Sequence, residues 1–131
     1  MPDELALARG WFLKAESDLN TAGRMVQSDG PYDTACFHPQ QAVEKYLKGL
    51  LAFRRQPFPP THDLEELQHL GEAVSAWPLA RLDLSELSSY AIGVRYDFEF
   101  WPDRRTAQDA VRLAREVRDC VLGVIPERAR P

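Results

Sequence analysis

The fold is set by a stretch near the N-terminus, residues 5–26, which reads LALARGWFLKAESDLNTAGRMV. Its large apolar residues recur at every seventh position, with alanines between them: Leu5, Phe12, Leu19 and Val26. Apolar residues that alternate by three and four form one stripe along a helix, and the small alanines let a second helix approach closely. We therefore expect a long amphipathic helix that ends at Asp29-Gly30-Pro31.

Four further segments show the same helical period. The second helix is expected from Tyr32 to about Phe53, with Asp33 as its cap, and the third from the cap Thr61 to just before Trp77. The fourth is expected from a capping box of Asp83 and Glu86 to Tyr96. The fifth is expected from Asp103 or Thr106 to Val124. No segment alternates with a period of two, so we predict an all-α fold, a five-helix up-down antiparallel bundle. The bundle occupies residues 1–126 as a single domain, and residues 127–131 form a loose C-terminal tail.

One residue conflicts with the second of these helices. Pro39 has no amide hydrogen, so the carbonyl of Ala35 lacks its partner in a helix that begins at Asp33. We predict either a local bend at this proline or a helix start delayed to about His38.

Length and composition point to one soluble domain. The chain has 131 residues, 44% of them hydrophobic and 27% charged, which is ordinary for a globular protein and excludes wholesale disorder. No apolar run approaches the ~18 residues that a membrane span needs, and the acidic N-terminus is unlike a signal peptide. The two cysteines, Cys36 and Cys120, form neither a metal-ligand spacing nor a disulfide framework. We therefore expect a cytoplasmic protein.

Charge is unevenly distributed along this chain of net charge −4. The overall balance disfavours a general nucleic-acid coat protein, because counterion release from phosphates needs a clustered excess of Lys and Arg. Residues 62–103 carry nine acids and two arginines, whereas residues 38–55 carry four basic residues and one acid. The basic segment is therefore able to attract a phosphate locally.

A polar stripe within this basic segment is the first candidate site. Its members follow spacings of three, four and three residues along the second helix: His38, Gln41, Lys45 and Lys48. Two ammonium groups, an amide and an imidazole suit a phosphate or the edge of a nucleotide. The alternative is an ordinary solvated helix face.

Two further candidates lie outside the stripe. His62, beside Asp63 at the start of the third helix, suits acid–base chemistry if a carboxylate holds its imidazole; the alternative is an ordinary first-turn residue. Arg95, followed by Tyr96 at the end of the fourth helix, either grips a phosphate with its guanidinium or caps the helix. We predict that both His62 and Arg95 contact a phosphate.

These candidates lead to expectations about the tertiary arrangement. We hypothesise that Lys45, Lys48 and Arg95 line one cleft, within the bundle or across a dimer axis. The aromatic residues after the fourth helix are expected to be buried or to contact a second copy, with base stacking as the alternative: Phe98, Phe100 and Trp101. The three histidines are too few and too spread to form a metal site, and we expect no cofactor.

The segment from Ala35 to Leu50, ACFHPQQAVEKYLKGL, closely resembles the signature helix of HEPN domains (higher eukaryote and prokaryote nucleotide-binding). Thr61-His62-Asp63-Leu64 and residues 90–96 are similar to two further blocks of this family. The resemblance covers residues 5–124 and implies a five-helix bundle that commonly pairs as a dimer. It also implies a nucleotide- or RNA-related role beside a separate minimal nucleotidyltransferase, in an arrangement resembling a toxin–antitoxin pair.

Some members of the family are metal-independent ribonucleases, in which an arginine is followed, after four to six residues, by a histidine. Arg95 stands where that arginine is expected, yet no histidine follows His69. We therefore expect a binding module rather than an enzyme. We also expect it to form a homodimer and to have a nucleotidyltransferase as its partner. The alternatives are a ribonuclease toxin that uses Arg95 and Tyr96 with an unusual acid–base group, and a purely structural dimerisation module.

Overall fold

The computed structural model describes residues 3–74 and 77–131, and within them the regular structure is helical throughout. The elements in chain order are α1 (Glu4–Met25), α2 (Asp33–Phe53), α3 (Leu64–Val74), the 3₁₀ helix η1 (Trp77–Arg81), α4 (Ser85–Tyr96), α5 (Arg104–Leu122) and the 3₁₀ helix η2 (Glu127–Ala129). The predicted all-α fold with five α-helices is confirmed. A search of these same residues finds no helix with the length and apolar character that crossing a membrane requires.

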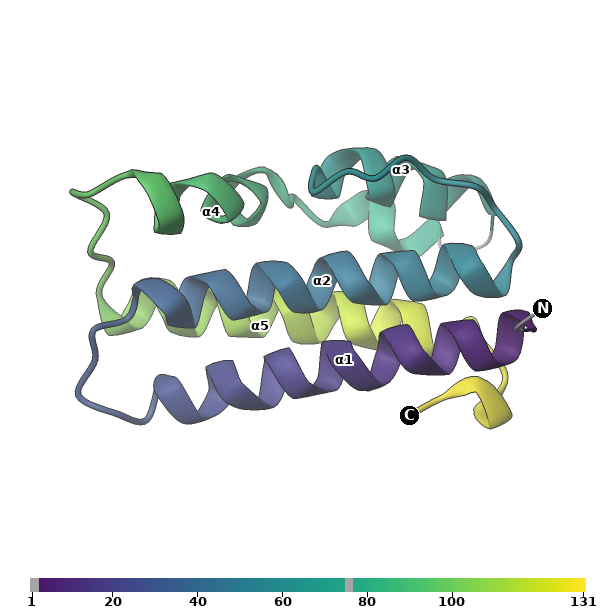
Figure 1. Cartoon of the computed structure of the whole chain (residues 1–131), viewed down its shortest axis with the longest axis horizontal. Coiled ribbons are helices and arrows are strands. Elements are labelled where there is room, and N and C mark those ends of the chain that lie inside the picture. Colours follow the sequence, from purple (N-terminus) through teal and green to yellow (C-terminus); the bar gives the residue numbers. More distant parts are fainter. Residues whose placement is uncertain (1–2, 75–76) are drawn as a thin grey trace.

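Helix α2 is the centre of the molecule, because it contacts each of the other four α-helices. In Figure 1, α1, α2 and α5 run side by side, while α3 and α4 follow one another along α2 on the side away from α1. The apolar stripe predicted for α1 faces this packing: Phe12, Leu19 and Val26 are buried, and Leu5 in the first turn is partly buried. Spacing by seven therefore predicted the buried face of α1 correctly.

The connection from α2 to α3 departs from a strict up-down order. The linker of residues 54–63 returns the chain to the middle of α2, where His62 lies against Glu44. Farther along α3, Gly71 lies beside Leu50, which is later in α2. Helix α3 therefore runs in the same direction as α2, and the return of the linker is what brings His62 onto the face of α2.

Two of the predicted caps are displaced by one or two residues. The helix α5 begins next to Asp103, one of the two predicted starts, and Asp103 caps it, since its Oδ1 accepts a hydrogen bond from the amide of Thr106. Before α3 the cap is Asp63 rather than Thr61, because Asp63 Oδ1 accepts hydrogen bonds from two amides in the first turn. Asp33 is the first residue of α2 rather than its cap.

The capping box predicted for α4 is absent. Asp83 Oδ1 accepts hydrogen bonds from the amide and hydroxyl of Ser85. In a capping box it would accept from the amide of Glu86, one residue later. Glu86 does not reach back to the chain before the helix, because its Oε1 accepts a hydrogen bond from the Tyr90 hydroxyl at 2.9 Å. Tyr90 thus competes for the carboxylate that a capping box needs.

Pro39 lies inside α2, which begins at Asp33 and continues to Phe53. The predicted start delayed to about His38 is therefore wrong, and a bend at the proline stays a prediction. Pro39 itself is buried. Most helical stability in proteins comes from tertiary packing, so the apolar contacts of α2 outweigh the hydrogen bond that the carbonyl of Ala35 loses.

The C-terminal residues are ordered against the bundle, in contrast to the loose tail that we expected. Residues 127–129 form η2, which contacts α1, and Ala129 is fully buried. Arg130 donates from Nε to the carbonyl of Leu122 at 2.9 Å, which ties the end of the chain to the last turn of α5.

Candidate functional site

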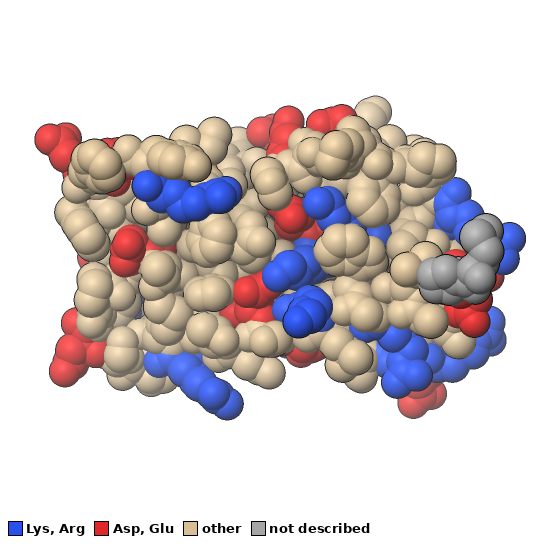
Figure 2. All heavy atoms as spheres, viewed as in Figure 1, with Lys and Arg blue, Asp and Glu red and all other residues tan. Residues whose placement is uncertain are grey.

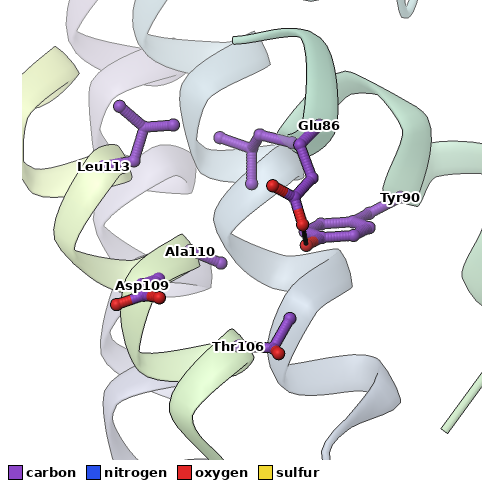
Figure 3. Close-up of a pocket in the computed structure, with 7 residues that line it drawn as sticks. Glu86, Tyr90, Thr106, Asp109, Ala110 and Leu113 are labelled. Atoms are coloured by element: carbon purple, nitrogen blue, oxygen red, sulfur yellow. Dashed lines mark hydrogen bonds between the residues drawn. The ribbon is translucent and has the colours of Figure 1, made fainter. Parts of the chain in front are cut away.

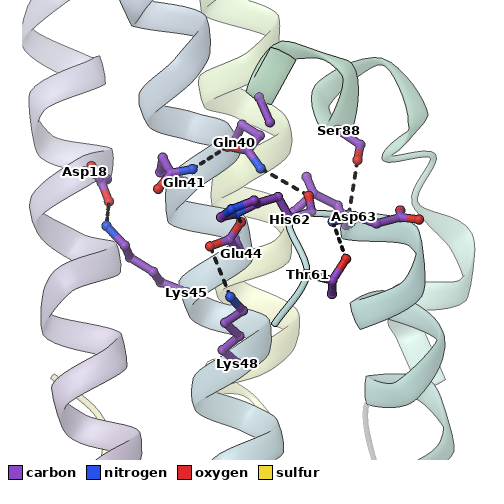
Figure 4. Close-up of polar contacts among 12 residues, drawn as sticks. Asp18, Gln40, Gln41, Glu44, Lys45, Lys48, Thr61, His62, Asp63 and Ser88 are labelled. Carbon is purple, nitrogen blue, oxygen red and sulfur yellow. Dashed lines mark hydrogen bonds and ion pairs between the residues drawn. The ribbon is translucent and has the colours of Figure 1, made fainter. Parts of the chain in front are cut away.

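A carboxylate from α1 holds two members of the predicted polar stripe. Asp18 accepts a hydrogen bond on one oxygen from His38 Nδ1 at 2.9 Å, and its other oxygen pairs with Lys45 Nζ. Figure 4 shows Lys45 extended from α2 toward Asp18 on α1. The side chains of His38 and Lys45 are 30% and 23% exposed, so this cluster lies at the surface between the two helices. Its charge is neutral when the imidazole is neutral.

A second carboxylate, Glu44, holds Lys48 and His62. Its Oε1 lies 2.7 Å from His62 Nδ1 and its Oε2 lies 3.3 Å from Lys48 Nζ (Figure 4). Glu44 and Lys48 are 4% and 8% exposed, so this ion pair is buried. The Lys48 ammonium also lies 5.7 Å and 6.0 Å from the ring centroids of Trp11 and Phe58. A buried ammonium between two aromatic rings needs Glu44 as its counter-ion.

The geometry at Glu44 also fixes the proton arrangement of His62. An ionised carboxylate only accepts hydrogen bonds, so the Nδ1 of His62 carries a hydrogen and donates it to Glu44. The Nε2 is left on the opposite side of the ring, and the side chain is 61% exposed. The sequence suggested the neighbouring Asp63 as the carboxylate that holds the His62 imidazole. In the structure this carboxylate is Glu44 on α2.

Two glutamines on α2 link this cluster to the loop before α3. Gln40 is fully buried and donates from Nε2 to the carbonyl of His62 at 3.5 Å. Gln41 donates from Nε2 to Gln40 Oε1 at 2.7 Å, so its amide is engaged within α2. The amide of Leu64 donates to Ser88 Oγ, which joins the start of α3 to α4 (Figure 4). The backbone that carries His62 is therefore held from both sides.

The predicted residues Arg95 and His62 line one pocket, which lies between α4 and the start of α3. The cavity has a volume of ≈ 400 Å³, and its walls are His62, Asp63, Ser88, Ser89, Ala91, Ile92 and Arg95. Arg95 donates from Nε to the carbonyl of Ala91 at 2.9 Å, and its guanidinium lies 5.4 Å from the Phe37 ring centroid and 5.9 Å from that of Tyr96. Within the described part of the chain, its two NH₂ groups have no hydrogen-bond partner.

The two lysines are not among the residues that line this pocket. Lys45 is turned to Asp18 on α1, and Lys48 is buried beside Glu44. Figure 2 accordingly shows acidic and basic side chains interleaved at the centre of this face rather than a uniform basic area. Contact of a ligand with His38, Gln41, Lys45 or Lys48 stays a prediction, as does a cleft shared by the lysines and Arg95.

A second pocket between α4 and α5 differs in its chemistry. Its cavity of ≈ 120 Å³ contains the carboxylates of Glu86 and Asp109 together with Tyr90 and Thr106 (Figure 3). Burial, and then the hydrogen bond to Glu86, raises the pKa of the Tyr90 hydroxyl above its ordinary value, so it stays protonated. The two carboxylates repel a phosphate, and Arg112, which pairs with Asp109 at 3.0 Å, compensates only one of them. Among the described residues, no group of histidine, cysteine and acidic side chains is arranged to hold a metal ion.

The aromatic residues after α4 divide into two groups. Phe100 is partly buried and packs on Tyr90, with 5.4 Å between ring centroids. Phe98 and Trp101 are 87% and 66% exposed, so the expected burial holds for Phe100 alone. Cys36 is fully buried, and burial raises the pKa of its thiol to about 12. It is a core residue.

Comparison with known families identifies one match. The model of the HEPN domain family matches residues 8–124, which is most of the chain. No curated protein and no solved structure matches. The matched range includes both carboxylate clusters and the pocket of His62 and Arg95.

Proposed function

The chain belongs to the HEPN domain family, and from this premise we propose that it is a binding module for the phosphate of a nucleotide or of RNA. The phosphate occupies the pocket lined by His62 and Arg95. The protein works as a homodimer with a separate minimal nucleotidyltransferase as partner, in an arrangement like a toxin–antitoxin pair. A small nucleotidyltransferase gene beside this one would support that partner.

The observation that carries the proposal is that Arg95 and His62 line one cavity, and that the Arg95 NH₂ groups and His62 Nε2 have no hydrogen-bond partner in the described chain. The NH₂ groups of Arg95 have no other partner in the described chain, and a guanidinium binds two phosphate oxygens at once. When its imidazole is protonated, His62 adds a second donor through Nε2, while Nδ1 stays hydrogen-bonded to Glu44 and the bound phosphate supplies the counter-charge. Ser88 and Ser89 place hydroxyl groups on the same wall.

We expect nucleotides to stabilise the protein through this pocket. ATP or GTP at ~100 times its dissociation constant adds about 2.7 kcal/mol to the free energy of unfolding. In a thermal-shift titration, Arg95→Ala and His62→Ala should each lose most of this shift, while Arg9→Ala, an exposed arginine on α1, keeps it. A shift that survives in Arg95→Ala would contradict the assigned pocket, and no shift with any nucleotide would favour a purely structural module.

The exposed apolar side chains at the end of α4 support the homodimer. Ile92, Tyr96, Phe98 and Trp101 are 66–87% exposed, and an apolar patch of this kind marks a protein contact. We expect light scattering to give a dimer mass for the wild type and a monomer mass for Phe98→Ser combined with Trp101→Ser. The matched control is Leu13→Ser on α1, where a single exposed leucine is replaced. A wild-type monomer at all concentrations would exclude the homodimer.

A second candidate function, RNA cleavage without a metal, is favoured by the contact of His62 with Glu44. In this reaction His62 Nε2 takes the proton of a ribose 2′-hydroxyl, whose oxygen attacks the adjacent phosphorus. The 5′-oxygen leaves with a proton returned by the imidazole, and Arg95 stabilises the charged transition state. Total RNA incubated with the protein in EDTA tests this candidate. Cleavage lost in both His62→Ala and Arg95→Ala supports it, and intact RNA with the wild type excludes it.

A further inference from the structure

A groove on another side of the molecule runs between the C-terminal half of α1 and the face of α5 that packs on it. Two adjoining cavities form it, and they share Gly23, Gln27 and Arg115. Polar side chains dominate its lining: four arginines (Arg24, Arg112, Arg115 and Arg118) and three amides (Asn20, Gln27 and Gln108). None of these residues belongs to the pocket of His62 and Arg95.

The groove carries an excess of positive charge in an acidic chain. Arg112 pairs with Asp109 at 3.0 Å, and Arg118 pairs with Asp119 at 3.1 Å. In the described ranges, Arg24 and Arg115 form no ion pair. Four arginines against two acids leave two uncompensated positive charges.

The shape of the groove depends on a glycine inside a helix. Gly23 lies within α1, where glycine destabilises a helix relative to alanine. The Nη2 of Arg115 lies 3.6 Å from the position that a Cβ of residue 23 would occupy. Glycine therefore leaves the guanidinium in contact with the backbone surface of α1, and a larger side chain would fill the space beneath it.

The spacing of the arginines on α5 suits a repeating anion. Arg112, Arg115 and Arg118 are three residues apart, so they rise by about 4.5 Å per step along the helix. Each guanidinium can hold two oxygens of one phosphate. No aromatic residue lines the groove, and its three apolar lining residues, Leu19, Val26 and Val111, are buried, so it lacks the exposed anchors that dominate protein–protein contacts. Amide side chains beside arginines are typical of contacts to sugars, phosphates and base edges.

We propose that the groove between α1 and α5 holds the phosphate backbone of a single nucleic-acid strand. The proposal goes beyond the phosphate pocket of the proposed function, because it assigns a second surface to internal phosphodiesters. RNA and DNA share this backbone chemistry, and the two are separated by the experiment.

The test is a fluorescence-anisotropy titration with a labelled oligouridylate about twelve nucleotides long, at several salt concentrations. Four phosphate contacts, in which phosphates displace Asp109 and Asp119 from Arg112 and Arg118, give a slope of log K against log salt of about −3, since each contact to a single strand contributes about −0.7. Arg24→Gln combined with Arg115→Gln should reduce the slope by about 1.4 and weaken binding about tenfold at low salt. Asp119→Asn should strengthen binding, because it releases Arg118 from its ion pair.

Controls keep the result specific to the groove. Arg9→Gln on α1 should bind like the wild type, and unchanged melting temperatures confirm that the variants fold. A deoxyuridine strand of equal length shows whether the 2′-hydroxyl contributes.

Three results would overturn the proposal: a wild-type slope near zero, equal binding by the Arg24 and Arg115 variant, or equal affinity for a polyglutamate peptide of similar length. Arg95→Ala separates this proposal from the pocket, because it should remove most of the shift with ATP while it lowers the salt slope by no more than one contact, about 0.7. Strand binding lost in Arg95→Ala and kept in the groove variant would assign the strand to the pocket and overturn the groove.

Discussion

Glu44→Ala is expected to lower the free energy of unfolding by about 3–5 kcal/mol, because it leaves the buried Lys48 without a counter-ion. The two side chains are only 6% and 10% exposed, and the ammonium lies between the rings of Trp11 and Phe58, away from water. The same substitution removes the hydrogen bond to His62 and so loosens the loop before α3. Urea denaturation monitored by circular dichroism measures the loss.

Two further variants show whether Glu44→Ala loses stability because a buried charge is left unpaired or because packing is lost. Glu44→Leu combined with Lys48→Leu removes both charges, so it should recover most of the stability. Asp18→Ala breaks a comparable cluster, but its partners Lys45 and His38 are more exposed and can be hydrated. We expect it to cost about 1 kcal/mol. A cost at Asp18 equal to that at Glu44 would contradict the role of burial.

The helices were predictable from the sequence because apolar spacing is a local property. The stripe that begins with Leu5 predicted the buried face of α1, and His38, Gln41, Lys45 and Lys48 do lie on one helix. The partners of that stripe were not predictable. Asp18 reaches α2 only because of how α1 and α2 are rotated against each other, and spacing along one helix does not contain that rotation.

The pocket depends on a chain reversal that proline content alone does not reveal. The prolines of residues 56–60 predict a stiff linker but not its direction. That direction places His62 over Glu44 and in one pocket with Arg95. The groove between α1 and α5 was missed for a related reason. Arg24 is far in sequence from the arginines of α5, and acids interspersed along α5 mask them in any count of local charge. The spacing of Arg112, Arg115 and Arg118 by three residues was the available signal.

Gly49→Val is expected to destabilise the protein by about 3 kcal/mol, at the upper end of the cost of overpacking a core. A Cβ at residue 49 would lie 2.5 Å from Phe12 Cε1 and 2.8 Å from its Cδ1. The Phe12 ring is fully buried and packs on Tyr46 with 6.3 Å between centroids, so it has no open space to move into. The helices α1 and α2 would have to separate at this contact, and thermal and urea unfolding measure the result.

The matched control for Gly49 is Gly10, a glycine of α1 that has open space where a Cβ would lie. Gly10→Ala should stabilise the protein by up to about 1 kcal/mol, because alanine is the better helix former and meets no neighbour. At residue 49 the same propensity gain is outweighed by the clash with Phe12. If the clash is the cause, Gly49→Ala combined with Phe12→Leu should be more stable than the sum of the two single changes predicts, because the smaller side chain makes room for the methyl group. Additive effects, or a stabilising Gly49→Ala, would show that the contact between α1 and α2 is looser than the structure describes.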